Sequence, residues 1–240
     1  MKKLFVLCGI GVLFVSCAST GAKKDFSPVL PAGVVWVSVD GDIRWDGEKK
    51  ESAGILGDLL NKKIDQSKNA ETSAFFSRAA TLTDETETML IEALNQSKVP
   101  LIAKEQVLGS VAYQNAEIQA LYARGDFHQP EGYRFVDQRK PAFARNLAAE
   151  TGARGSLYAN FVFTKQMLNG VGKNGSMTAA VTMNVFMINA DGKVFFKKTY
   201  HVKGDDKLPV VFGVYDHKKF VDMIPAVIQT VCSKFAADLL

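Results

Sequence analysis

The sequence has few of the residues that most often carry chemistry in protein sites. Three cysteines and three histidines occur among its 240 residues. His128, His201 and His217 lie in different parts of the chain, and none has a cysteine or a carboxylate at the spacing of a metal site. We therefore expect no metal centre and no bound cofactor.

Motifs of the common catalytic folds are also missing. The chain contains no G-x-S-x-G, no phosphate-binding P-loop and no dinucleotide fingerprint. Asp40, Asp42 and Asp46 superficially resemble a calcium loop, but Arg44 and Trp45 occupy positions where an EF-hand needs a ligand and a glycine. A turn is the better interpretation of this segment.

A glycine-rich stretch over residues 170–175 contains a lysine, as phosphate-binding loops do. A phosphate cradle precedes a helix, whereas this stretch is expected to join two strands. With no catalytic residues to name, the sequence predicts a protein that is not an enzyme.

The chain also lacks a large excess of charge. Its formal net charge is +4, and two of its lysines lie at the extreme N-terminus. Several other lysines occur as separated pairs, a pattern typical of solvated faces. A nucleic-acid-binding protein usually carries a clustered basic surface, so we expect no nucleic-acid partner.

The apolar run near the N-terminus is short. Lys2 and Lys3 precede residues 4–15, which carry no charge and are too few to cross a bilayer as a helix. This pattern predicts a signal peptide over residues 1–16.

Cys17 stands where that apolar run ends. The segment FVSC over residues 14–17 resembles a bacterial lipobox, which implies that Cys17 is acylated and becomes the mature N-terminus. Two or more acyl chains hold a protein stably on a membrane. Ala18 follows the cysteine and, by resemblance to Gram-negative lipoproteins, favours the outer membrane, facing the periplasm. An ordinary signal peptide with an incidental cysteine is the alternative.

Residues 17–32 are small, polar and proline-containing, and they are predicted to form the lipidated N-terminus and a flexible tether. Residues 33–240 are predicted to form a single domain. Within it, Cys232 lies among apolar residues at helical spacing, so we expect a buried thiol and not a nucleophile.

Apolar periodicity predicts the elements of the first half of this domain. Residues 34–39 are β-branched and almost continuously apolar, as in a strand covered on both faces. Residues 99–103 indicate a short edge strand, and Thr83 is a candidate helix N-cap. Helical spacing predicts helices over residues 55–64, 86–94, 107–122 and 143–150.

The second half changes to a period of two. Alternation over residues 156–164, 177–188 and 193–203 predicts three antiparallel strands. The glycine-rich connection over residues 166–175 is expected to be mobile. The long apolar stripe over residues 220–239 predicts a helix that packs on the sheet, with Pro225 as a kink or start.

These elements define an α+β, or layered α/β, fold class. We expect a mixed sheet of about five strands with an antiparallel C-terminal meander, flanked by amphipathic helices.

Three stretches resemble envelope lipoproteins with an anticodon-binding-like α/β domain. They are the strand at residues 34–39, LIAKEQVL at 101–108, and LAAETGARGSLYANF at 147–161. That group includes the curli-secretion lipoprotein, the N-terminal domain of the Tol-system translocation protein, and the lipoprotein activators of peptidoglycan synthases. The resemblance implies the layered fold and a partner among envelope proteins or cell-wall components. A looser resemblance is to spirochaetal lipoproteins whose amphipathic helices insert into the outer membrane.

The sequence supports two functions. The first is a lipid-anchored, non-enzymatic interaction or assembly module in the periplasm. The alternative is a membrane-active or lipid-binding lipoprotein that inserts amphipathic helices into the outer membrane. The oligomeric state does not follow from the sequence.

Overall fold

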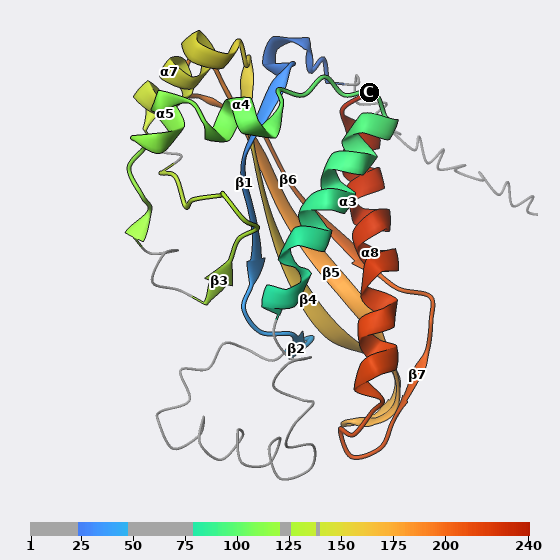
Figure 1. The fold of residues 1–240 in the computed structure, drawn as a ribbon. Helices are drawn as coiled ribbons and strands as arrows, with labels where there is room; N and C mark the ends of the chain where they lie inside the picture. The colour runs from blue at the N-terminus through green and yellow to red at the C-terminus, as the bar shows by residue number, and fades with distance from the viewer. Residues whose placement is uncertain (1–23, 48–78, 121–125, 138–139) are drawn as a thin grey trace, which may run out of the picture.

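A long mixed sheet with helices on both faces dominates the structure, which is a computed structural model (Figure 1). The structure describes residues 24–47, 79–120, 126–137 and 140–240. These residues confirm the α+β class. The helix predicted over residues 55–64 and the lipidation site Cys17 lie outside the described residues.

Seven described strands form one sheet, in the spatial order β3-β1-β4-β5-β6, with β2 beside β4 and β7 beside β5. β1 runs parallel to β4, and every other pairing along that order is antiparallel. The strands are β1 (Ala32–Asp40), β2 (Arg44–Trp45), β3 (Phe127–His128), β4 (Gly155–Val171), β5 (Asn174–Asn189), β6 (Val194–Lys203) and β7 (Leu208–Val210).

The β4–β5 hairpin is longer than the sequence pattern predicts. The connection expected as a mobile loop over residues 166–175 is instead mostly strand, and Val171 pairs with Asn174 across a tight turn. Gly170 and Gly175 have positive φ angles of 113° and 143°. A Cβ at Gly170 would lie 1.8 Å from the Asn174 carbonyl oxygen. These glycines therefore allow close strand pairing and do not create a loop.

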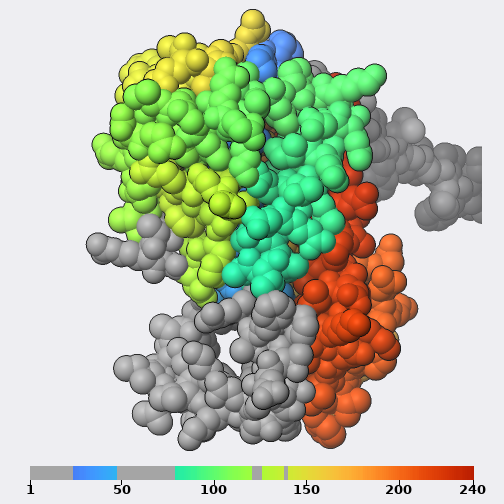
Figure 2. Space-filling view, in the orientation of Figure 1, coloured from blue at the N-terminus to red at the C-terminus, as the bar shows by residue number. Residues whose placement is uncertain are grey.

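One face of the sheet is covered by two long helices, α3 (Thr83–Gln96) and α8 (His217–Asp238). The two helices lie side by side in Figures 1 and 2. The apolar stripe of α8 is buried against β5, as predicted. Ile228, Val231 and Phe235 share a core with Met183 and Met187. Pro225 lies inside α8 and does not end it.

The other face of the sheet is covered near its upper end in Figure 1 by shorter helices, which are α4 (Lys104–Leu108), α5 (Val111–Gln114) and α7 (Pro141–Thr151). Trp36, Tyr113, Leu147 and Tyr158 form the centre of a second core beneath them. β1 is buried on both faces, as its continuous apolar sequence predicts.

Two predictions between these helices are wrong. The single helix expected over residues 107–122 is divided into α4 and α5, because Ser110 interrupts it and caps α5 by accepting a hydrogen bond from the Tyr113 amide. The strand expected over residues 99–103 contributes only one bridge, between Leu101 and Ala32.

Thr83 does not cap α3 as predicted. It is the first residue of the helix, and its hydroxyl donates to the Ala80 carbonyl, while no side chain caps the N-terminus. The acidic residues of the first turn, Asp84 and Glu85, lie where the helix dipole favours negative charge.

A buried carboxylate on α3 binds the first residue of α4 and a tyrosine that precedes α7. Glu87 accepts a hydrogen bond of 2.9 Å from the Tyr133 hydroxyl and forms an ion pair of 2.8 Å with Lys104. Lys104 also lies 4.9 Å from the centre of the Tyr133 ring. The three groups satisfy one another, so we assign this cluster a structural role.

The predicted tether over residues 17–32 is too long at its C-terminal end. Phe26 and Val29 are buried, and Ser27–Val29 form a 3-10 turn, η1, ahead of β1. The Phe26 ring contacts the edges of Phe195 and Phe196 at centroid distances of 5.8 and 5.2 Å. Apolar packing therefore attaches the chain to the sheet from Phe26 onward.

Candidate interaction surface

The structure does not bring the candidate residues of the sequence together into a site. Cys17 lies outside the described residues. Cys232 is fully buried in α8, and burial raises the pKa of its thiol to about 12, as expected for a core residue.

The histidines lie apart, as their spacing indicates. His201 is exposed on β6 and bonds Thr182 at 3.0 Å, His128 lies 3.6 Å from Asp126, and the His217 ring lies 4.3 Å from that of Tyr215. Within the described ranges, no three histidine, cysteine or acidic residues cluster as metal ligands would, and this includes Asp40, Asp42 and Asp46.

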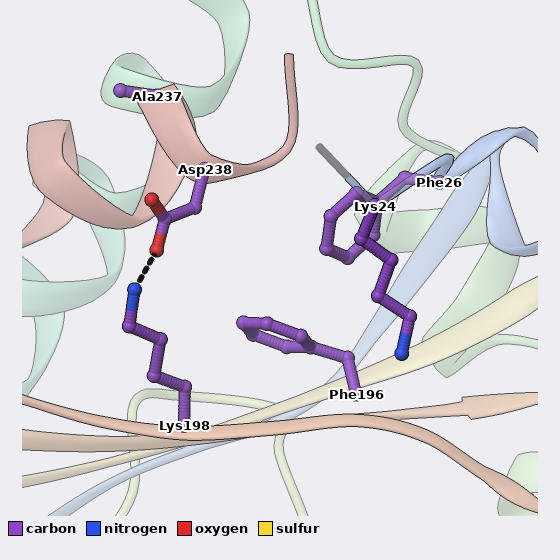
Figure 3. Close-up of a pocket in the computed structure, with 6 residues that line it drawn as sticks. All are labelled: Lys24, Phe26, Phe196, Lys198, Ala237 and Asp238. Carbon is purple, nitrogen blue, oxygen red and sulfur yellow. Dashed lines mark hydrogen bonds and ion pairs between the residues drawn. The ribbon is translucent and has the colours of Figure 1, made fainter. Parts of the chain in front are cut away.

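A shallow cavity of about 250 Å³ lies at the end of the sheet where the N-terminal segment meets the C-terminal end of α8. Figure 3 shows the residues that line it, which are Lys24, Phe26, Phe196, Lys198, Ala237 and Asp238.

The polar groups of this cavity already bond one another. Asp238 accepts hydrogen bonds from Lys198 and from the Tyr200 hydroxyl. Partial burial acts to raise the pKa of Asp238, but these two hydrogen bonds hold that pKa below its usual value. Lys24 donates to the Phe195 carbonyl. The cavity is therefore best explained as the junction that attaches the N-terminal segment to the sheet and α8.

The opposite end of the sheet carries exposed apolar side chains. We define the tip patch as Val171, Val211, Phe212 and Val214, which are 85%, 60%, 76% and 41% exposed. Val171 lies at the turn between β4 and β5, and the other three lie between β7 and α8. Large apolar side chains gathered in this way are typical of interaction surfaces.

Hydrogen bonds hold the loop of the tip patch in one conformation. Val211 and Val214 exchange backbone hydrogen bonds of 3.0 and 2.9 Å. The Gly213 amide donates to the Lys173 carbonyl at 2.8 Å, and the Phe212 amide donates to Asn174 Oδ1 at 2.6 Å. The loop is thus fastened both to itself and to the β4–β5 turn.

Phe212 occupies an unusual backbone conformation. Its φ angle is +51°, in the left-handed region that favours glycine. In the described part of the chain, Lys98 is the one other non-glycine residue with positive φ. A bulky residue there costs about 1–2 kcal/mol, and sites of this kind often have a functional reason.

Aromatic and basic residues adjoin the loop of the tip patch. Lys173 lies 5.4 Å from the centre of the Trp45 ring, and the Trp45 and Tyr215 rings meet edge to face at 6.0 Å. Lys218 and Lys219 are exposed in the first turn of α8, beyond the cap formed by Asp216.

The tip patch and the N-terminal segment lie at opposite ends of the sheet. Gly155 begins β4 beside Ala32, and Val171 ends it at the tip patch. At about 3.3 Å per residue, the 17 residues of β4 span about 50 Å. In Figure 1, the C-terminus lies at the upper end of α8, while β7 and the β4–β5 turn lie at the lower end.

The sequence prediction missed this surface. The signal was present as the apolar run of residues 210–214, which includes a glycine and precedes the helix cap at Asp216. Such a run is compatible with either a strand or a loop. Only the fold shows that Val210 is buried in the core, whereas the residues that follow it lie outside the core.

α8 is long and apolar enough to cross a membrane by length and composition, but half of its most apolar window is buried in the domain. Core helices pass the same test, and the buried stripe of α8 explains its composition.

No protein-family model matches the chain, and no curated protein matches it. Among solved structures, the chain is similar to the NMR structure of E. coli LpoB, with 17% sequence identity and a TM-score of 0.28. The similarity covers 72% of this chain and 58% of that one, so the chain spans less than two thirds of the LpoB chain. This is a loose resemblance, and it carries no argument about function.

Proposed function

We propose that the protein is a lipid-anchored, non-enzymatic interaction module of the bacterial cell envelope, held at the outer membrane through acylated Cys17 and facing the periplasm. The observation that carries this proposal is the arrangement of the two ends. The segment that leads toward Cys17 packs at one end of the sheet, and the tip patch is exposed at the other.

This arrangement suits a protein that presents a surface at a distance from its anchor. The long β4–β5 hairpin is covered by α3 and α8 along one face, which makes it a stiff support. The partner is an envelope protein or a cell-wall component, as the family resemblance of the sequence implies.

The described helices give little support to the alternative function, which is insertion of amphipathic helices into the membrane. The apolar side chains of α3 and α8 are buried in the shared core, and exposing them would remove the cover of the sheet. Burying one large apolar side chain is worth about 1.5–3 kcal/mol, so releasing either helix would cost most of a typical domain's stability.

Acylation of Cys17 is tested by Cys17→Ala in the full chain. Mass spectrometry of the wild-type N-terminus should find an acylated Cys17, and Cys17→Ala should move the protein out of the membrane fraction. Cys8→Ala is the matched control, because Cys8 lies within the expected signal peptide and its loss should leave fractionation unchanged. A mature chain with an unmodified Cys17 thiol would refute the anchor.

A further inference from the structure

The tip patch contributes little to the core of the domain. Phe212 leaves most of its ring in solvent, and Val171 is more exposed still. The fold therefore gains little apolar burial from these side chains, although it holds them in a defined arrangement.

Glycine or asparagine would be the easier residue at position 212. Both adopt positive φ more readily than phenylalanine does. The Phe212 side chain is mostly exposed, so its packing offsets little of the backbone strain. The hydrogen bonds at Asn174 and Gly213 nonetheless fix the backbone so that the ring projects from the surface. An aromatic side chain presented in this way is preorganised for contact with another molecule.

The shape and surroundings of the tip patch indicate the kind of molecule. One aromatic ring flanked by three valines has the size of a binding hot spot, in which a central aromatic anchor fills an apolar pocket. Exposed Lys218 and Lys219 lie in the adjoining turn of α8, where Asp216 is 3.9 Å from Lys219. A complementary surface would have an apolar centre and an acidic rim.

We propose that the tip patch is a preformed docking knob that inserts Phe212 into an apolar, acid-rimmed pocket of another envelope protein. This inference deepens the proposed function and rests on it.

The position of the patch favours a protein over the membrane that holds the anchor. The chain between Cys17 and Lys24 reaches at most about 25 Å when fully extended, and the sheet separates Lys24 from the tip patch by about 50 Å. The tip patch reaches that membrane only if the sheet lies flat along it.

The first experiment places a photocrosslinking benzophenone amino acid in the full chain in intact cells. It replaces Phe212, Val171 or, as a control, Val194, which is also an exposed apolar residue but begins β6 near the other end of the sheet. We expect Phe212 and Val171 to crosslink to the same protein, identified by mass spectrometry, and Val194 not to do so.

The second experiment measures the affinity of the purified crosslinked protein for variants of the chain. Phe212→Asn keeps a residue that tolerates positive φ but removes the ring, so the variant should fold, which a thermal melt verifies. Loss of a hot-spot aromatic should weaken binding by about 30-fold or more. Phe212→Tyr, which keeps the ring, should retain most of the wild-type affinity, and Val194→Asn should leave the affinity unchanged.

The possible results separate this inference from the proposed function. Equal affinity of wild type and Phe212→Asn for the crosslinked protein would overturn the docking knob and leave the interaction module standing. Two results together would make the tip patch a membrane contact and overturn the inference. Phe212 and Val171 would crosslink to lipid alone, and the wild-type chain would bind phosphatidylethanolamine–phosphatidylglycerol vesicles while Phe212→Asn would not. The absence of protein crosslinks from Phe212 and Val171 would also overturn it.

Discussion

Replacement of Ile228 by lysine tests whether α8 belongs to the core. Ile228 lies at the centre of the α8 stripe and is completely buried against the sheet. Truncation of such a residue to alanine costs about 2–5 kcal/mol, because the lost burial is joined by a cavity. Lysine adds an unpaired charge to an apolar site, a further cost of several kcal/mol. A domain with a total stability of about 5–15 kcal/mol should barely survive it, or unfold.

The assay is thermal and urea denaturation of the chain from residue 17 onward with Cys17→Ser, which avoids lipid. A loss of 1 kcal/mol lowers Tm by about 2–4 °C in a domain of this size, so a loss of about 2–5 kcal/mol in Ile228→Ala should lower Tm by about 4–20 °C. Gln229→Lys is the control, because Gln229 is exposed on the same helix. If Ile228→Lys melts at the same temperature as Gln229→Lys, the stripe is not core and membrane insertion becomes the leading function.

Acid should weaken the junction at the end of α8. Hydrogen bonds hold the pKa of Asp238 low despite partial burial. The folding stability that Asp238 contributes is therefore present above the ordinary carboxyl pKa and is lost as the pH falls through the lowered pKa. Urea denaturation at several pH values should show this loss in wild type, and an equal loss in Asp238→Asn would contradict it. Phe212→Gly should leave the free energy of unfolding unchanged or raise it by up to about 1 kcal/mol, because relieved strain is offset by a more flexible unfolded chain; a clear loss in urea denaturation would mean that the ring packs. Glu87→Ala should lower the stability by about 1–3 kcal/mol by leaving the Tyr133 hydroxyl and Lys104 without their acceptor, and an unchanged urea midpoint would show that water replaces the carboxylate. Chelator and reductant should not change Tm, because the sequence has no expected metal site and Cys232 has no expected partner thiol; a large drop with chelator would reveal a missed metal.

Periodicity predicted the elements whose burial follows directly from their sequence. β1 is apolar at almost every position because helices cover both of its faces. β5 alternates because one of its faces packs on α8. The stripe of α8 repeats at helical spacing because only one side of the helix meets the sheet. Each pattern reports a local environment, so a short window contains the information.

The errors occur where a single residue outweighs the pattern. The apolar residues of 107–122 keep helical spacing, but Gly109 and Ser110 allow the chain to turn and to start a new helix with a side-chain cap. In the β4–β5 hairpin, glycines are associated with loops in general, whereas Gly170 and Gly175 lie opposite each other and remove two Cβ atoms from a close backbone contact. The cross-strand partner of a glycine is not visible in the sequence.

The tip patch could not be predicted for a related reason, and this reason is what makes it informative. Val211, Phe212 and Val214 have the composition of a core segment, and their exposure depends on where β7 ends on β5. β7 pairs with residues 175–177 of β5, close to the β4–β5 turn, so the chain that follows β7 has almost no sheet left to cover. Apolar side chains placed beyond the end of the sheet find little cover among the described residues, while the hydrogen bonds of their loop keep them from folding back. A surface built in this way stays exposed until another molecule covers it.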